Sequence, residues 1–196
     1  MNKKCNFCNL DTSKIYNTIL EETNNFFVIP TLGSLTEGYV LIVSKTHLYN
    51  MDELCDNIKE EYFNLIEKYR TLFKKIYNKY PIVFEHGASK LNLNKTSSSV
   101  VHAHTHIVNH NYIDELSLIK ELKFKRINKL SNYSNKNYIF YISPNNKKYI
   151  TTNFESISQL MRIKIAKDLG FKDKYNWKKE TFNNNIISTI QKLKIH

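Results

Sequence analysis

Residues 100–108 read Val100-Val101-His102-Ala103-His104-Thr105-His106-Ile107-Val108 and place three of the seven histidines two residues apart in an apolar run. A period of two is strand spacing, because successive strand side chains point to opposite faces at a rise of about 3.3 Å per residue. The pattern predicts a strand with all three imidazoles on one face. Since an unperturbed histidine has a pKa of about 6.5, such a row can supply a nucleophile, an acid, a base or a metal ligand.

The elements around this strand predict an α+β domain. Strands are expected over 26–29 and 39–43, followed by apolar residues at steps of three and four over 54–80, which indicate a long amphipathic helix that Pro81 ends. A strand over 82–85 then leads through a polar loop to the histidine strand. A hairpin, a helix and a second hairpin together predict an antiparallel sheet with the helix on one face.

Beyond about residue 115 the pattern changes, and we divide the chain into a first domain, 1–115, and a C-terminal extension, 116–196, packed on or beside it. A lysine-rich helix is expected over 114–129. Strands are expected over 138–142 and 148–151, and helices over 156–169 and 181–193. The sequence therefore predicts a mixed extension rather than a tail.

The composition limits location and partners. The 196 residues are 41% hydrophobic, and we find no uninterrupted apolar run of membrane-spanning length, so the chain is expected to be cytoplasmic and to have no membrane partner. The formal net charge of +11 fits either guidance of phosphates toward a site or a plain compositional bias toward lysine. A nucleic-acid partner stays open on this evidence but is not favoured.

Three interpretations of the histidine row are open from the residues alone. The imidazoles could share one catalytic metal, decorate a surface, or act on phosphorus, with one neutral ring as nucleophile and a second group balancing charge. The apolar residues on both sides argue against surface decoration. Nucleophilic catalysis is the interpretation we favour.

Residues 102–108 resemble the signature of the histidine triad superfamily, in which histidines alternate with mostly apolar residues and two apolar residues follow. The order of other features matches as well: a cysteine pair at Cys5 and Cys8, and a hairpin strand from Gly38 that leads to His47. The resemblance covers about residues 1–115. This resemblance implies a five-stranded antiparallel sheet with a long helix. Within the superfamily, the chain resembles the zinc-containing bacterial-type hydrolases that carry a C-terminal extension.

The resemblance implies a nucleotide hydrolase or transferase that acts at the α-phosphate. His104, the middle histidine, would form a covalent nucleotidyl-histidine intermediate with a dinucleoside polyphosphate or a nucleoside phosphoramidate. A charged His106 would stabilise the phosphoryl oxygens and the leaving group. Ser99 matches a family position whose hydroxyl contacts phosphate, and Ser98, at a position often filled by glutamine, is assigned to substrate binding beside it.

The same comparison implies a structural zinc ion bound by Cys5, Cys8, His47 and His102. Two thiolates and two imidazoles form a closed tetrahedral set, a composition typical of structural rather than catalytic zinc. The residues alone leave two alternatives for the cysteine pair, a redox pair and two buried thiols without a function.

Some positions depart from the family pattern. Thr31 stands where many members hold the ribose with an acidic residue, and Phe84-Glu85-His86-Gly87 replaces an asparagine-rich turn. We assign Gly87 to substrate binding and keep Glu85 and His86 as candidates for it.

The extension and the partners leave further alternatives. Arg162 in the extension is a candidate phosphate ligand, because its planar fork suits phosphoryl oxygens. The alternative functions are a nucleotide- or RNA-binding module with little catalysis and a deadenylase of nucleic-acid ends. Family members often form homodimers through the long helix and a neighbouring strand, and a homodimer stays open here.

Overall fold

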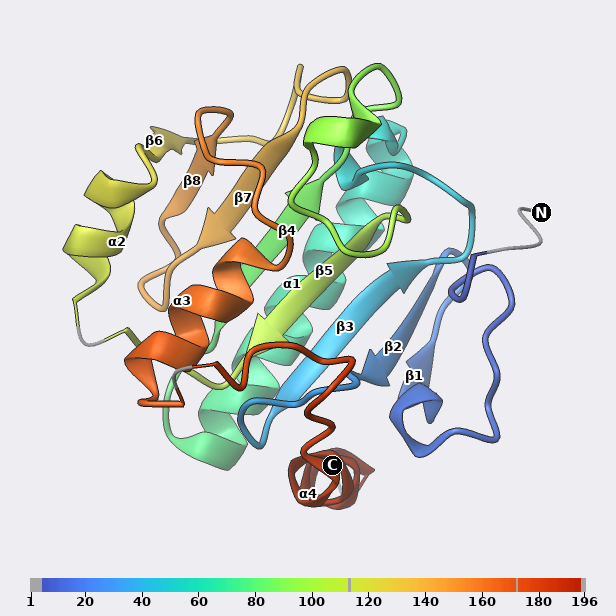
Figure 1. The fold of residues 1–196 in the computed structure, drawn as a ribbon. Helices are drawn as coiled ribbons and strands as arrows, with labels where there is room; N and C mark the ends of the chain where they lie inside the picture. The colour runs from blue at the N-terminus through green and yellow to red at the C-terminus, as the bar shows by residue number, and fades with distance from the viewer. Residues whose placement is uncertain (1–4, 113, 172, 195–196) are drawn as a thin grey trace.

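The structure, a computed structural model, describes residues 5–112, 114–171 and 173–194. These residues form one antiparallel sheet of eight strands, in the order β1-β2-β3-β5-β4-β7-β8-β6, with helices on both faces (Figure 1). The strands are β1 (Glu21–Glu22), β2 (Phe26–Pro30), β3 (Tyr39–Ser44), β4 (Ile82–Gly87), β5 (His104–Val108), β6 (Lys125–Ile127), β7 (Tyr138–Ile142) and β8 (Lys148–Thr151). The α-helices are α1 (Asp56–Tyr77), α2 (Glu115–Glu121), α3 (Leu160–Asp168) and α4 (Asn183–Lys194), and short 3-10 helices lie at Ile15–Asn17, Met51–Glu53 and Leu93–Lys95.

The α+β fold with an antiparallel sheet is confirmed, but the histidine strand begins later than the sequence predicts. β5 starts at His104, because the backbone just before it turns toward the segment that follows β3, where the Ala103 amide donates to the Leu48 carbonyl at 2.7 Å. The Ala103 carbonyl accepts from the amide of Ser44, the last residue of β3, at 3.2 Å. His102 therefore lies outside the strand. The expectation of three histidines in one strand holds for His104 and His106 only.

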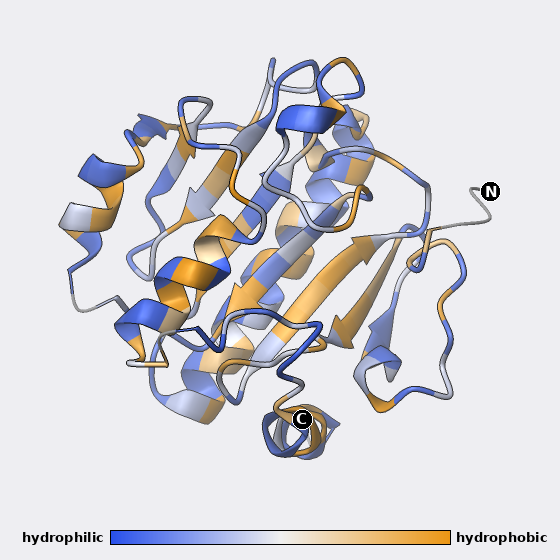
Figure 2. Cartoon of the chain, viewed as in Figure 1, coloured by the Kyte–Doolittle hydropathy of each residue, from blue (hydrophilic) through white to orange (hydrophobic). Residues whose placement is uncertain are grey.

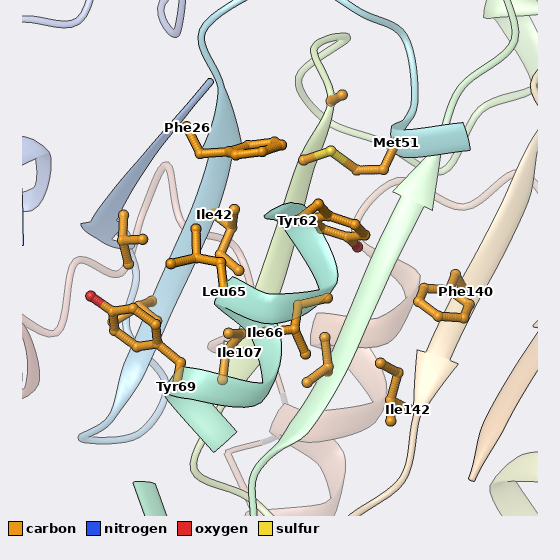
Figure 3. Packing of buried hydrophobic residues seen from close by; sticks show 14 of the residues in the cluster. Phe26, Ile42, Met51, Tyr62, Leu65, Ile66, Tyr69, Ile107, Phe140 and Ile142 are labelled. Atoms are coloured by element: carbon orange, nitrogen blue, oxygen red, sulfur yellow. The ribbon is translucent and has the colours of Figure 1, made fainter. Parts of the chain in front are cut away.

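Helix α1 covers one face of the sheet, and its buried side chains interlock with those of the strands (Figure 3). Its apolar positions bury Tyr62, Leu65, Ile66, Tyr69 and Phe73 against the sheet. Each such side chain contributes about 1.5–3 kcal/mol by leaving water.

Helix α1 is shorter at both ends than the predicted apolar pattern over 54–80. The Asn50 side chain accepts from the Asp52 amide and caps a 3-10 turn, so the helix itself starts at Asp56. It ends before Pro81, because Asn78 adopts the left-handed conformation (φ 55°) that closes many helices.

The extension continues the same sheet rather than forming a separate layer. β7 pairs with β4 from Val83–Ile142 to Gly87–Tyr138, so β4 lies between β5 and β7 and has no edge open to a second chain. The predicted helix over 114–129 is wrong beyond α2, because Lys123 takes a positive φ of 53° and Lys125–Ile127 pairs with β8. Charged residues in β1 and β6 occupy the two sheet edges, a common protection against further strand pairing.

Helix α3 packs on the face opposite α1, where Leu160, Met161 and Ile165 join a second buried cluster (Figure 1). Figure 2 shows hydrophobic residues along the central strands between these two layers. In the residues that the structure describes, none of the helices combines the length and the apolar character needed to cross a membrane.

The loop between β2 and β3 is tied to the end of the chain. The Gly33 amide donates to the Thr181 carbonyl at 3.1 Å, and the Gly38 amide donates to the Thr189 hydroxyl of α4 at 2.9 Å. Gly33 has a φ of 74°, and a Cβ there would lie 2.6 Å from the Cβ of Trp177. A side chain at position 33 would therefore separate the extension from this loop.

Candidate functional site

Four side chains from three distant segments converge near the N-terminus. Cys5 and Cys8 come from the first turn, His47 from the turn after β3, and His102 from the residues just before β5, and their ligand atoms all lie within 4.8 Å of one another. Cys5 Sγ lies 3.3 Å and Cys8 Sγ 3.6 Å from His102 Nδ1. His47 Nδ1 lies 3.2 Å from Cys8 Sγ and 3.1 Å from His102 Nδ1.

This cluster fits a tetrahedral metal ion. Bond lengths near 2.1 Å to nitrogen and 2.3 Å to sulfur place tetrahedral ligands about 3.4–3.8 Å apart, close to the distances found here. The other ring nitrogen of His102, Nε2, donates to the Ser44 carbonyl at 2.7 Å, which leaves Nδ1 unprotonated and free for a metal. The four residues thus form a site compatible with a metal, as the sequence predicts.

A cavity of about 310 Å³ lies beside this cluster, a size within the range of small-molecule sites. Its walls come from the N-terminal segment, from β2 and β3, from β5 and from the extension. The lining residues are Asn6, Phe7, Asn9, Asp11, Lys14, Tyr16, Asn17, Ile29, Pro30, Thr31, Leu32, Leu41, Ser99, Val100, His104, His106, Arg162 and Trp177.

His104 is oriented by its own backbone neighbourhood. Its Nδ1 donates to the His102 carbonyl at 2.6 Å, so the proton of the neutral ring is on Nδ1 and the lone pair is on Nε2. Burial lowers the pKa of His104 from 6.5 to about 4, against a smaller rise from that hydrogen bond. Near neutral pH the ring is an uncharged base that lines the cavity.

His106 follows two residues later on the same face of β5. Its ring stacks on Phe84 with centroids 4.4 Å apart, and its Nδ1 lies 2.9 Å from the Tyr39 hydroxyl oxygen. Burial holds the pKa of His106 well below 6.5, with smaller contributions from His104, His86 and Arg162. This burial favours the neutral form of the His106 ring in the free protein.

Of the predicted substrate contacts, Ser99 and Arg162 line the cavity, whereas Ser98 and Gly87 do not. The Ser98 hydroxyl instead donates to the Val100 carbonyl at 2.6 Å and holds the loop. Gly87 pairs with Tyr138, and a Cβ there would lie 2.4 Å from the Tyr138 ring. The absence of a side chain at Gly87 leaves space for the Tyr138 ring. Gly87 therefore has a packing role here and does not line the cavity.

Three aromatic residues at this site are not among the site residues predicted from the sequence. Phe7, between the two cysteines, contacts the rings of His102 and His104 at centroid distances of 5.6 and 5.2 Å. The indole nitrogen of Trp177 donates to the Ser99 hydroxyl at 3.1 Å, and Tyr39 bonds His106. Of the three, only Phe7 could have been identified from the sequence, because a metal ion bound by Cys5 and Cys8 would fix the position of the residue between them.

The candidates Glu85 and His86 lie on opposite faces of β4. His86 lies on the side of His106, with ring centroids 6.3 Å apart, and its Nε2 accepts from the Met161 amide at 3.4 Å. Glu85 lies among the residues under α1, where it accepts from the Met51 amide and the Tyr138 hydroxyl, both at 2.7 Å. Among the described residues that line the cavity, neither Glu85 nor His86 is present. The bonds of Glu85 to Met51 and Tyr138 give it a role in holding the fold together.

Glu85 makes stability depend on pH. Burial is the largest cause that raises its pKa from 4.5 to about 8, so the folded protein binds a proton there that the unfolded chain releases above about pH 4.5. The free energy of unfolding therefore falls as pH rises from about 4.5 to 8, by roughly 1.4 kcal/mol per unit. We expect Glu85→Gln to raise the melting temperature, and to raise it more at pH 8 than at pH 6.5.

Differential scanning calorimetry of both proteins at several pH values measures this difference. A loss of even about 2 kcal/mol in the wild type corresponds to roughly 4–8 °C. An equal difference in melting temperature at both pH values would show that Glu85 is ionised throughout.

The first part of the chain is similar to known proteins. A family model described as the HIT domain matches residues 12–112. "Protein hit" of Bacillus subtilis (strain 168) is 28% identical over 108 residues, which cover 54% of this chain and 70% of that protein.

Two solved structures are similar to part of the chain. A HIT family member from Bacillus subtilis is 22% identical, with a TM-score of 0.43 and coverage of 54% of this chain and 72% of that one. A Zn-bound histidine triad family protein from Mycobacterium smegmatis is 19% identical, with a TM-score of 0.45 and coverage of 58% and 79%. Because the family model matches more than half of the 196 residues, this chain belongs to the histidine triad (HIT) family.

Proposed function

We propose that the protein is a nucleotide hydrolase or transferase that acts at the α-phosphate through His104. One observation carries this proposal: the 2.6 Å bond from His104 Nδ1 to the His102 carbonyl puts the lone pair on Nε2 in a residue that lines the cavity. A neutral, oriented imidazole is the form of histidine that attacks phosphorus. Substrates of the proposed class are dinucleoside polyphosphates and nucleoside phosphoramidates.

The proposed reaction has two steps. First, the Nε2 lone pair of His104 bonds to the α-phosphorus while the bond from phosphorus to the leaving group breaks; the leaving group departs with the electron pair, and an amine leaving group also takes a proton from solvent. Second, a water oxygen bonds to the same phosphorus and gives a proton to solvent, the P–N bond breaks with its electron pair returning to Nε2, and the nucleoside monophosphate leaves. His106 and Ser99 line the cavity beside His104 and would donate hydrogen bonds to the phosphoryl oxygens.

Mass spectrometry of the intact protein tests this function. The protein is mixed with adenosine and guanosine polyphosphates and phosphoramidates, and the reaction is quenched under conditions that preserve P–N bonds. We expect one nucleotidyl adduct that is acid-labile, maps to His104 and is absent in His104→Ala. Binding of nucleotide with neither adduct nor product would support the binding module instead.

We also propose that the ion held by Cys5, Cys8, His47 and His102 is zinc, with a structural role. Two thiolates and two imidazoles are a donor set that zinc prefers, and they leave no open position for substrate. A bound zinc ion would supply a crosslink between the N-terminal turn and the strands. That crosslink would hold Phe7 against His104 at one wall of the cavity.

A further inference from the structure

Arg162 lies on α3, outside residues 12–112 that match the HIT domain, yet it reaches the cavity of the proposed catalytic site. Arg162 is only 3% exposed. Guanidinium Nη2 donates to the Gly33 carbonyl at 2.6 Å, and Nε donates to the Tyr175 carbonyl at 3.1 Å. Two of its three nitrogens are thus engaged by the backbone of two different segments, which fixes the group in place.

The engaged nitrogens limit what Arg162 can do for a phosphate. Bidentate binding of a phosphoryl group needs two parallel N–H donors on one edge of the guanidinium. Nε is bonded to the Tyr175 carbonyl, so the edge formed by Nε and Nη2 is occupied, and a direct fork to a phosphate would have to use Nη1 and the second hydrogen of Nη2. The anchored guanidinium can also act through a neighbouring residue.

Tyr39 is the residue that Arg162 can act through. The Arg162 Cζ lies 5.6 Å from the centroid of the fully buried Tyr39 ring, so the positive charge of the guanidinium faces that ring. The Tyr39 hydroxyl oxygen lies 2.9 Å from His106 Nδ1. The Arg162 cation beside the ring makes the phenolic hydrogen more acidic than it would be without that charge, which favours Tyr39 as the donor and His106 Nδ1 as the acceptor of this bond.

The direction of the hydrogen bond between Tyr39 and His106 determines the tautomer of His106. When Nδ1 accepts from Tyr39, the proton of the neutral imidazole is on Nε2. His104 has the opposite arrangement, with its proton on Nδ1. The two rings, with centroids 4.9 Å apart, then have complementary roles, with one lone pair for attack and one N–H for donation.

We propose that Arg162 is a positioning residue that acts through Tyr39 to hold His106 as an Nε2–H donor beside the attacking nitrogen of His104. The role of His106 toward substrate rests on the function proposed above, whereas the tautomer is a property of the free protein. The extension then completes the site of the HIT segment. The substrate contact comes from His106, and Arg162 stays bonded to the backbone.

The tautomer is measured without substrate by long-range ¹H–¹⁵N NMR of the full chain labelled at histidine nitrogens, with His106 signals assigned by their loss in His106→Gln. We expect a protonated Nε2 in the wild type. Tyr39→Phe keeps the ring and removes the hydroxyl, so the Nδ1–H form should become populated, and Arg162→Met should shift the ring in the same direction. Arg162→Lys, which keeps a donor and the charge, should restore part of the wild-type signal.

Tyr62→Phe is the matched control, because Tyr62 is equally buried but bonds Thr105 on the opposite face of β5 at 2.8 Å. It should leave the His106 tautomer unchanged. A wild-type ring protonated on Nδ1, or a tautomer unaffected by both Tyr39→Phe and Arg162→Met in proteins that melt cooperatively, would overturn the proposal.

Kinetics then separate positioning from direct contact. We expect Tyr39→Phe and Arg162→Met each to lower kcat about tenfold with little change in KM, and the double variant to lose no more than the larger single loss. Residues that act through one another show such non-additivity. Multiplied losses with a raised KM for Arg162→Met would instead mean that Arg162 contacts the phosphate. If no substrate turns over, the proposed function fails while the NMR result still decides the tautomer.

Discussion

Replacing His104 with alanine is expected to lower kcat by a factor on the order of 10³ or more, because the variant has no nitrogen at the position of attack. The fold should survive this change. The lost bond to the His102 carbonyl is worth about 1 kcal/mol, which corresponds to a fall in melting temperature of roughly 2–4 °C. Steady-state kinetics with the substrate that gives the adduct, together with calorimetry, measure both effects.

His110→Gln is the control for this experiment. His110 is also buried and follows His104 by six residues, but it lies 3.0 Å from Asp168 and is not among the residues that line the cavity. This variant should keep kcat within about twofold of the wild type. Turnover by His104→Ala at a rate near that of the wild type would exclude the covalent mechanism and leave direct attack by water.

Hydrophobic periodicity was sufficient for most of the sheet. The strands expected over 138–142 and 148–151 agree with β7 and β8, because each is a short β-branched or aromatic run bounded by polar turns. The start of the histidine strand and the helix over 114–129 were wrong for a common reason. In both, a backbone feature that periodicity does not encode decides the structure: a bond from Ala103 to the distant Leu48, and a left-handed conformation at Lys123.

The site was only partly predictable. The family resemblance implies the set Cys5, Cys8, His47 and His102, and the structure brings these four residues into one cluster. The sequence does not tell which way a loop side chain points, and therefore Ser98 and Ser99 could not be separated. Tyr39 is a further case: an aromatic residue at the start of a buried strand is indistinguishable from the core until its hydroxyl is seen beside His106.

Removing zinc is expected to have the second large effect. Treatment with a strong chelator, or Cys8→Ser, should lower the melting temperature by about 10 °C or more, because several kcal/mol of metal binding stabilise the folded state alone. The activity should fall as well, since the turn that carries Phe7 would no longer be held against the His104 ring. Metal analysis by mass spectrometry, calorimetry and kinetics on the same samples measure the three quantities.

The third cysteine supplies the control. Cys55 is exposed and precedes α1, away from the cluster, so Cys55→Ser should retain one zinc per chain and the wild-type melting temperature. This comparison separates metal binding from general effects of losing a thiol. If the wild-type protein contained no zinc after purification without chelators and its melting temperature did not respond to added zinc, the four residues would be a reduced thiol and imidazole cluster. The position of Phe7 would then depend on packing alone, and chelators would leave kcat unchanged.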